Sequence, residues 1–217
     1  MASARLKTAG AMVLLGVVAT AAAFMVSASH EWSRERIAAN DRARLVARLN
    51  SVLSPSLRGR DLTTTRIAAT DPALLGSDEP VDVFVITEGG EPMATLFATA
   101  TPHGYNAPIH LLVGVSPQGV VTGVRTVRHR ETRGLGDAID ATKSDWIEQF
   151  LGTSLAAPPA SLWAVPQDDG EFDAIAGATV TSRAVIGAVK NTLTYFAAHR
   201  DELYARAAAE AEQAARP

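Results

Sequence analysis

The chain has 217 residues, with 20 Lys or Arg and 23 Asp or Glu, so its net charge at pH 7 is −3. This near balance excludes the strongly basic surface typical of nucleic-acid-binding proteins, and we expect no nucleic-acid partner. The chain contains no cysteine, which excludes disulfides, thiolate metal sites and iron–sulfur ligation by its own residues. Any redox role would therefore require an organic cofactor, or one bound through histidines and carboxylates.

The N-terminal segment carries the strongest membrane signal. Residues 9–29 contain no charged side chain, whereas Arg5 and Lys7 precede them and Glu31 follows. At about 1.5 Å per residue this stretch spans roughly 30 Å, the thickness of a bilayer core. We therefore predict that residues 1–29 form a short cytoplasmic tip and a single transmembrane anchor, with the rest of the chain on the other side. A cleaved signal peptide is the alternative, and the length of the apolar run favours the anchor.

A charged, helix-forming segment follows at 31–53. Its apolar residues Ile37, Leu45, Leu49 and Val52 recur at roughly helical spacing. Pro55 and the polar residues after it are typical of an irregular connection, or of a short strand near residues 66–68. We predict that residues 30–75 are a stalk helix and a linker.

The next part of the chain reads as paired β-strands. Residues 81–87 and 94–101 are rich in β-forming side chains, and the break between them contains two glycines. A second pair, 109–116 and 120–127, flanks another turn. Their apolar–polar alternation predicts an antiparallel sheet with one face buried.

Helical patterns dominate from residue 136 onward. Short pieces are expected at 137–141 and 144–151, a short strand at 162–165 and a long helix at 183–199. Strands first and helices later predict an α+β domain. We place this domain at residues 76–200 and expect a helical tail that frays at 201–217.

The stretch from Asp173 to Ser182 is the most informative part of the chain. Gly177 and Ala178 leave room for a bulky group against the backbone. Thr181 or Ser182 is expected to cap the long helix, whose free N–H groups and positive dipole end then face Thr179. A phosphate is favoured at such a helix start. The pattern therefore predicts a hydroxyl attachment point for a phosphorylated cofactor.

This stretch resembles the flavinylation motif of the FMN-binding family: an Asp, two spacers, a small hydroxyl residue, Gly, Ala and Thr. Ala176 replaces the small hydroxyl residue. Residues 131–137 resemble the family's Glu-Thr-Pro-Gly-Leu-Gly loop, with Arg133 in place of Pro, and residues 104–109 are similar to a segment at the start of its sheet. The similarity covers about residues 81–195.

The resemblance implies that Thr179 carries FMN through a phosphodiester bond to its side-chain oxygen. It also implies cofactor contacts from the turn before the long helix, from the glycine-containing loop and from two aromatic residues: Asp173, Gly177, Ala178, Thr181 and Ser182; Glu131, Thr132, Gly134, Leu135 and Gly136; Tyr105 and Trp146.

Several alternatives to these roles remain open. The Thr179 hydroxyl could satisfy a backbone group instead, with Thr181 as the acceptor. Asp173 could bind a metal used during attachment or cap a turn. Tyr105 and Trp146 could be ordinary core residues. The spacing of the histidines matches no ligand pattern, and we expect no metal site in the protein.

Within the FMN-binding family the chain is most similar to G subunits of Rnf electron-transport complexes. The resemblance implies a membrane-anchored electron carrier in a complex that links ferredoxin and NAD to ion translocation, with its FMN domain in the bacterial periplasm and its anchor in the inner membrane. Its partners would be other subunits of that complex. A separate flavin transferase would attach the FMN, because the chain has no glycine-rich nucleotide loop, and we expect no autonomous active site. The alternatives are a C subunit of a sodium-translocating NADH:quinone reductase, or a non-redox flavin-binding or regulatory module anchored to the membrane.

Overall fold

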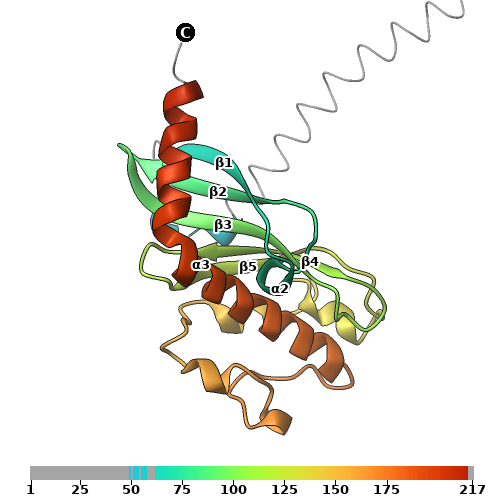
Figure 1. Cartoon of the computed structure of the whole chain (residues 1–217). Helices are drawn as coiled ribbons and strands as arrows, with labels where there is room; N and C mark the ends of the chain where they lie inside the picture. The colour runs from blue at the N-terminus through green and yellow to red at the C-terminus, as the bar shows by residue number, and fades with distance from the viewer. Residues whose placement is uncertain (1–48, 50, 54, 58–61, 215–217) are drawn as a thin grey trace, which may run out of the picture. The chain divides into compact units, whose positions relative to one another are not determined.

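A computed structural model describes residues 49, 51–53, 55–57 and 62–214 (Figure 1). All of these belong to one compact unit, Arg48–Pro217. The predicted membrane anchor and most of the predicted stalk helix lie outside the described residues. Within those ranges, none of the helices combines the length and apolar character that crossing a bilayer requires.

The domain is built on a five-stranded antiparallel sheet whose strands follow chain order: β1 (Thr63–Ala69), β2 (Val81–Glu88), β3 (Glu91–Thr101), β4 (Ile109–Val115) and β5 (Val121–Arg128). The α+β class is confirmed for the described residues. The sheet begins before residue 76, where we expected the domain to start. Thr65, Ile67 and Ala69 are the buried residues of β1. Two of these three are small or polar, which is why the strand lacks a clear hydrophobic alternation.

The connection between β2 and β3 confirms the predicted hairpin. Gly89 and Gly90 occupy the turn with φ values of 58° and 89°, and Glu88 pairs with Glu91 across it. Positive φ at both central positions matches the right-handed twist of the two strands and favours glycine.

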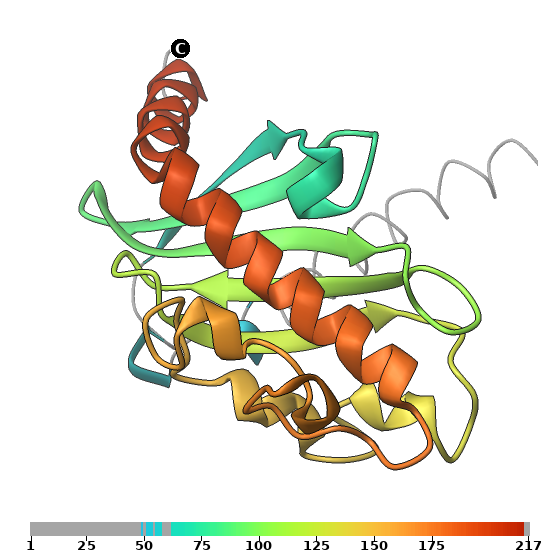
Figure 2. The ribbon, with the colours of Figure 1, turned by 60° about the horizontal axis from the view of Figure 1, so that its bottom comes forward.

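One face of the sheet is covered by α3 (Thr179–Ala214), which runs obliquely across it (Figure 2). Apolar residues of α3 and of the strands form the main core, in which Phe97 meets Tyr195 and Phe196 edge-on with ring centroids 6.1 and 6.2 Å apart. The helix is longer than predicted at both ends. Its extension beyond residue 200 stays helical to Ala214 because Leu203 and Ala207 are buried in the same core.

The opposite face of the sheet is also buried, so the prediction of one buried face is wrong. Leu49, Val52, Leu53 and Leu57, the last in the 3-10 turn η1 (Pro55–Leu57), pack there against side chains of β2, β3 and β4. The backbone of Val52 lies over a paired Gly114 and Gly123: an added Cβ would lie 2.7 Å from Val52 O at Gly114 and 2.9 Å from Val52 Cα at Gly123. A second layer therefore replaces solvent on this face.

The chain between β5 and α3 forms loops and four 3-10 turns: η2 (Gly136–Ile139), η3 (Trp146–Phe150), η4 (Ala160–Leu162) and η5 (Pro166–Asp168). The strand predicted at 162–165 is wrong. Trp163 instead packs against Phe150 and Phe172, with ring centroids 6.2 and 4.5 Å apart. Trp163 is therefore part of an aromatic cluster and does not belong to a strand. The short helix α2 (Pro72–Leu75) lies between β1 and β2 along the chain. Asp71 caps its start, because the Asp71 side chain accepts hydrogen bonds from two backbone N–H groups.

Candidate functional site

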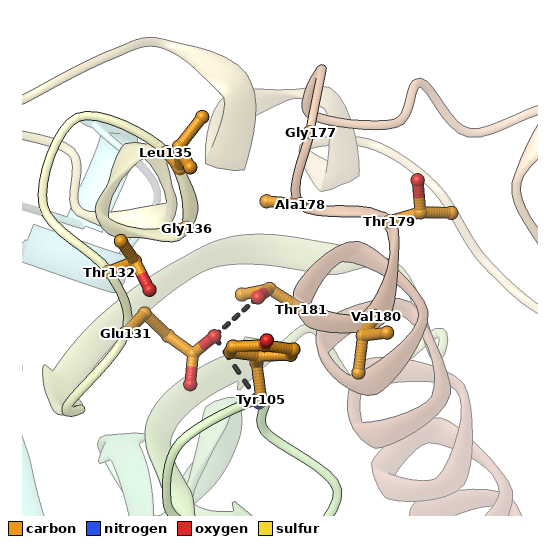
Figure 3. A pocket seen from close by; sticks show the side chains of 10 residues that line it. All are labelled: Tyr105, Glu131, Thr132, Leu135, Gly136, Gly177, Ala178, Thr179, Val180 and Thr181. Carbon is orange, nitrogen blue, oxygen red and sulfur yellow. Dashed lines mark hydrogen bonds between the residues drawn. The ribbon is translucent and has the colours of Figure 1, made fainter.

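A cavity of about 490 Å³ opens where three segments meet: the loop after β3, the loop after β5 and the start of α3 (Figure 3). This volume lies within the range of about 300–1,000 Å³ that is usual for small-molecule sites. Nine of its ten lining residues are among those predicted from the sequence, and the tenth is Val180: Tyr105, Glu131, Thr132, Leu135, Gly136, Gly177, Ala178, Thr179, Val180 and Thr181.

The start of α3 supplies unused hydrogen-bond donors to this cavity. The first backbone bond of the helix runs from Ser182 N to Ala178 O at 3.0 Å. The N–H groups of Thr179, Val180 and Thr181 precede this bond, so the helix itself does not use them. Together with the positive end of the helix dipole, these donors favour an anion.

The turn into the helix requires a glycine at position 177. Gly177 has a φ of 75°, which side-chain-bearing residues rarely adopt. A Cβ at this position would also lie 3.1 Å from Leu135 Cδ2. The missing side chain therefore both permits the turn and leaves space at the cavity wall.

The two threonines at the helix start differ in what their hydroxyl groups do. Thr179 is half-buried, and its hydroxyl has no hydrogen-bond partner among the described residues. Thr181 is 1 % exposed, and its hydroxyl donates to Glu131 Oε2 (Figure 3). Of the two candidate attachment points, only Thr179 has a hydroxyl without a hydrogen-bond partner among the described residues.

The predicted capping role of Thr181 or Ser182 is wrong, because α3 begins at Thr179 and both residues lie inside its first turn. Ser182 is fully buried. Its hydroxyl accepts from Ile175 N at 2.9 Å and donates to Ala178 O at 3.2 Å. Ser182 thus holds the preceding loop against the helix from behind the cavity wall.

Glu131 joins the three segments that form the cavity. Its side chain is buried, and its oxygens accept from the backbone N–H groups of Tyr105 and Asn106, both at 3.3 Å, and from the Thr181 hydroxyl. Gly136 leaves room for this arrangement, since a Cβ there would lie 3.1 Å from Glu131 Oε2. The sequence predicts Glu131 as a cofactor contact and does not reveal this joining role, because the hydrogen-bond partners of its carboxylate lie 25–50 residues away in the sequence.

Three exposed apolar side chains gather at the rim of the cavity. Tyr105, Leu135 and Val180 are 67 %, 44 % and 47 % exposed, and they account for three of the five exposed large hydrophobic residues in the described part of the chain. Exposed apolar side chains that gather at one opening mark a binding surface. Val180 was not predicted, although an apolar residue beside the motif threonine in the first turn of a helix is a usable signal.

Four predicted residues do not line the cavity: Asp173, Gly134, Trp146 and Ser182. Trp146 Nε1 donates to the carbonyl oxygen of Asp173 at 2.8 Å, which fixes the approach of the chain to α3. Gly134 N donates to Asp137 Oδ1 at 2.8 Å and shapes the neighbouring loop. These residues support the segments of the site from outside.

Arg183, one turn after Thr179 along α3, forms an ion pair with Asp168. Arg183 Nε and Nη2 donate to the two carboxylate oxygens of Asp168 at 2.6 and 2.8 Å. The hydrogen bond from Arg183 keeps the pKa of Asp168 below its usual value. Both side chains are well exposed, so this pair orients η5 against the helix and contributes little to stability.

Comparison with known proteins agrees with this geometry. The sequence profile of the FMN-binding domain matches residues 104–194, which include every residue that lines the cavity. The chain is 40 % identical over 195 residues to the G subunit of the ion-translocating oxidoreductase complex of Shewanella loihica, covering 90 % of this chain and 92 % of the relative.

Two further relatives carry the same name. The G subunit of Pseudomonas aeruginosa is 40 % identical over 193 residues, covering 89 % of this chain and 90 % of the relative. That of Pseudoalteromonas atlantica is 35 % identical over 192 residues, covering 88 % and 89 %. Because this identity extends over nearly the full length of both compared chains, the chain belongs to the family of G subunits of ion-translocating oxidoreductase complexes and contains an FMN-binding domain.

Proposed function

We propose that this protein is the FMN-carrying electron-transfer subunit of a membrane-bound, ion-translocating oxidoreductase complex, and that its FMN is esterified to Thr179. The names of its relatives and the FMN-binding profile support the role. The observation that carries the attachment site is the free hydroxyl of Thr179 beside three unused N–H groups at the mouth of the cavity.

The residues present fit a flavin phosphate. The N–H groups of the first turn of α3 would bind phosphate oxygens, as they do at other helix starts. The glycine at position 177 lets the group approach the backbone closely. Covalent attachment at Thr179 makes retention of the cofactor independent of its binding affinity, which matters for a cofactor held close to solvent.

The apolar rim fits the flavin ring. Tyr105, Leu135 and Val180 would contact its faces, whereas Glu131 and Thr181 would hold the surrounding segments in place. FMN, when bound, accepts and releases the electrons. The protein's own part is to orient the ring, limit its access to water and set the charge around it.

Attachment requires a second protein. The sequence contains no glycine-rich nucleotide loop, and no group placed to activate the Thr179 hydroxyl contacts it among the described residues. Thr179 is therefore the acceptor of a separate flavin transferase. The apolar segment at residues 9–29 would anchor the chain in the bacterial inner membrane with its FMN domain in the periplasm, where other subunits of the complex are its electron-transfer partners.

The direct test is in-gel flavin fluorescence after denaturation. The full chain, produced with a flavin transferase, should give a band that fluoresces under ultraviolet light in SDS, and its mass should increase by one FMN less one water. Thr179→Val should abolish both signals, Thr179→Ser should restore attachment, and Thr181→Val should retain it. A dark band in the presence of the transferase, or a fluorescent Thr179→Val band, would overturn the proposal.

A further inference from the structure

Beside the cofactor cavity lies a second hollow, of about 650 Å³, lined by residues that follow β5. The two hollows share Glu131 as a lining residue. We use the term basic face for the exposed side chains of Arg128, Arg130, Arg133 and Lys143, of which the last three line the second hollow.

The cations of the basic face lack carboxylate partners among the described residues. Those residues include ten Lys or Arg, and five of these form ion pairs: Arg66, Arg125, Arg183, Arg200 and Arg206. Of the remaining five, four are the basic face and the fifth is Lys190. Arg128 contacts the His110 ring instead, through Nη2 and Nε2 at 2.7 Å. The unpaired positive charge of the described domain is therefore concentrated next to the cofactor cavity.

The acidic residues of the same loop do not neutralise this face by pairing with it. Asp137 Oδ1 accepts from Gly134 N at 2.8 Å, and Asp140 Oδ1 accepts from the backbone and hydroxyl of Thr142, both at 2.9 Å. Those bonds lower the pKa of Asp140, with smaller contributions from His129 and Lys143. Glu131, Asp137 and Asp140 also line the hollow, but Glu131 is buried and the other two are half-buried, so the charged side chains between positions 128 and 143 that are most exposed to a partner are the four cations.

The basic face adjoins the apolar rim of the cavity. Leu135, which is 44 % exposed, lies two residues after Arg133 in the same loop. Apolar and aromatic side chains bordered by charge are typical of protein interfaces, in which arginine is enriched. Complementary charge speeds association and orients small electron-transfer interfaces.

We infer that the basic face docks an acidic surface of the electron-transfer partner protein, so that the partner approaches the cofactor at the Tyr105–Leu135 rim. This inference rests on the proposed function. It is favoured over an anionic membrane surface because the positive charges border the apolar cavity mouth, which is the point through which electrons must pass to another protein.

Zero-length cross-linking tests the inference in native membranes. A carbodiimide activates a partner carboxylate, the Lys143 amine displaces the activating group to form an amide, and the carbodiimide leaves as a urea. The chain contains only three lysines, Lys7, Lys143 and Lys190, so the cross-linked peptides are readily assigned by mass spectrometry. We expect a cross-link from Lys143 to a partner subunit, with a yield that falls severalfold in high salt because exposed charges are screened.

Matched variants separate the effect of the positive charge from that of the reactive amine. Lys143→Arg keeps the charge and should abolish the cross-link, whereas Lys190→Arg should leave it intact. Arg130→Glu combined with Arg133→Glu should lower both the cross-link yield and the rate of flavin reduction in membranes severalfold, with in-gel flavin fluorescence unchanged.

The following outcomes would overturn the inference: a normally fluorescent protein without a Lys143 cross-link, a cross-link insensitive to salt, or charge-reversed variants whose flavin is reduced more slowly only in membranes that contain anionic lipid. Loss of flavin attachment in the charge-reversed protein would assign the face to the cofactor and also reject it. Failure of the proposed function is distinguished by a dark band from the unaltered chain.

Discussion

The hydrogen bond between Thr181 and Glu131 gives the sharpest prediction about the site. Thr181→Val removes the hydroxyl and keeps the shape of the side chain, so the change isolates one bond. Both groups are buried: Thr181 is 1 % and Glu131 6 % exposed. The variant leaves the carboxylate with its two backbone donors, from Tyr105 and Asn106.

The expected loss can be estimated from the chemistry of the pair. A hydrogen bond to a charged group contributes about 1.5–3 kcal/mol to the free energy of unfolding. For a domain of this size each 1 kcal/mol corresponds to about 2–4 °C, so Tm should fall by about 3–12 °C. Thr194→Val is the matched control, because its hydroxyl donates to a backbone carbonyl of α3 on an exposed surface. We expect the control to change stability by no more than about 0.5 kcal/mol.

Thermal unfolding of the flavin-free full chain in detergent, followed by circular dichroism, measures the difference. A double-mutant cycle with Glu131→Gln should show coupling, since both single changes disrupt the same bond. Equal Tm values for Thr181→Val and Thr194→Val, or purely additive effects in the cycle, would refute the role that we assign to Glu131 in joining the three segments.

Three further predictions follow from the same structure. Gly123→Ala should destabilise the domain by about 1–3 kcal/mol, because the new Cβ meets the backbone of Val52 on the second buried face of the sheet. Gly187→Ala should stabilise α3 by about 0.5–1 kcal/mol in the same denaturation assay, because its new Cβ meets nothing within 4 Å. Gly177→Ala should reduce flavin attachment severalfold in the gel assay, whereas Gly134→Ala should not, although both have φ near 75° and both incur about 1–2 kcal/mol of backbone strain. Burial, and the charge of a nearby arginine, lower the pKa of His110, so the unfolded chain binds a proton more readily; stability should fall as pH drops below about 6.5, and His110→Gln should weaken that dependence.

Each of these predictions has a clear contrary result. Equal stability of the two alanine variants at positions 123 and 187 would mean that the segment does not pack on the sheet as described. Equal flavin attachment by the variants at positions 177 and 134 would remove the cavity as the reason for the glycine. If the unfolding free energy of His110→Gln has the same pH dependence as that of the unaltered chain, the titration belongs to another group.

Much of the site was predictable because its signals are local. The Gly-Ala-Thr sequence before a helical pattern marked Thr179, and the loop from Glu131 to Gly136 carried its glycines in a recognisable order. The four later strands followed from β-forming runs broken by glycine turns. The sequence left the region of β1 open between an irregular connection and a short strand near residues 66–68, because Thr65 and Ala69, which occupy two of the three core positions of the strand, weaken its hydrophobic alternation.

The remaining features depend on contacts between distant segments. Glu131 meets Thr181 across 50 residues, and Thr122 Oγ1 donates to the carbonyl oxygen of Val52 across 70. Periodicity and turn chemistry report how each stretch of chain folds locally, and they predicted four of the five strands, the long helix and the Gly-Ala-Thr motif before it. They carry no information on which buried donor reaches which acceptor, since that depends on how separate elements pack; the joining role of Glu131, the free hydroxyl of Thr179 and the second buried face of the sheet emerged only from that packing.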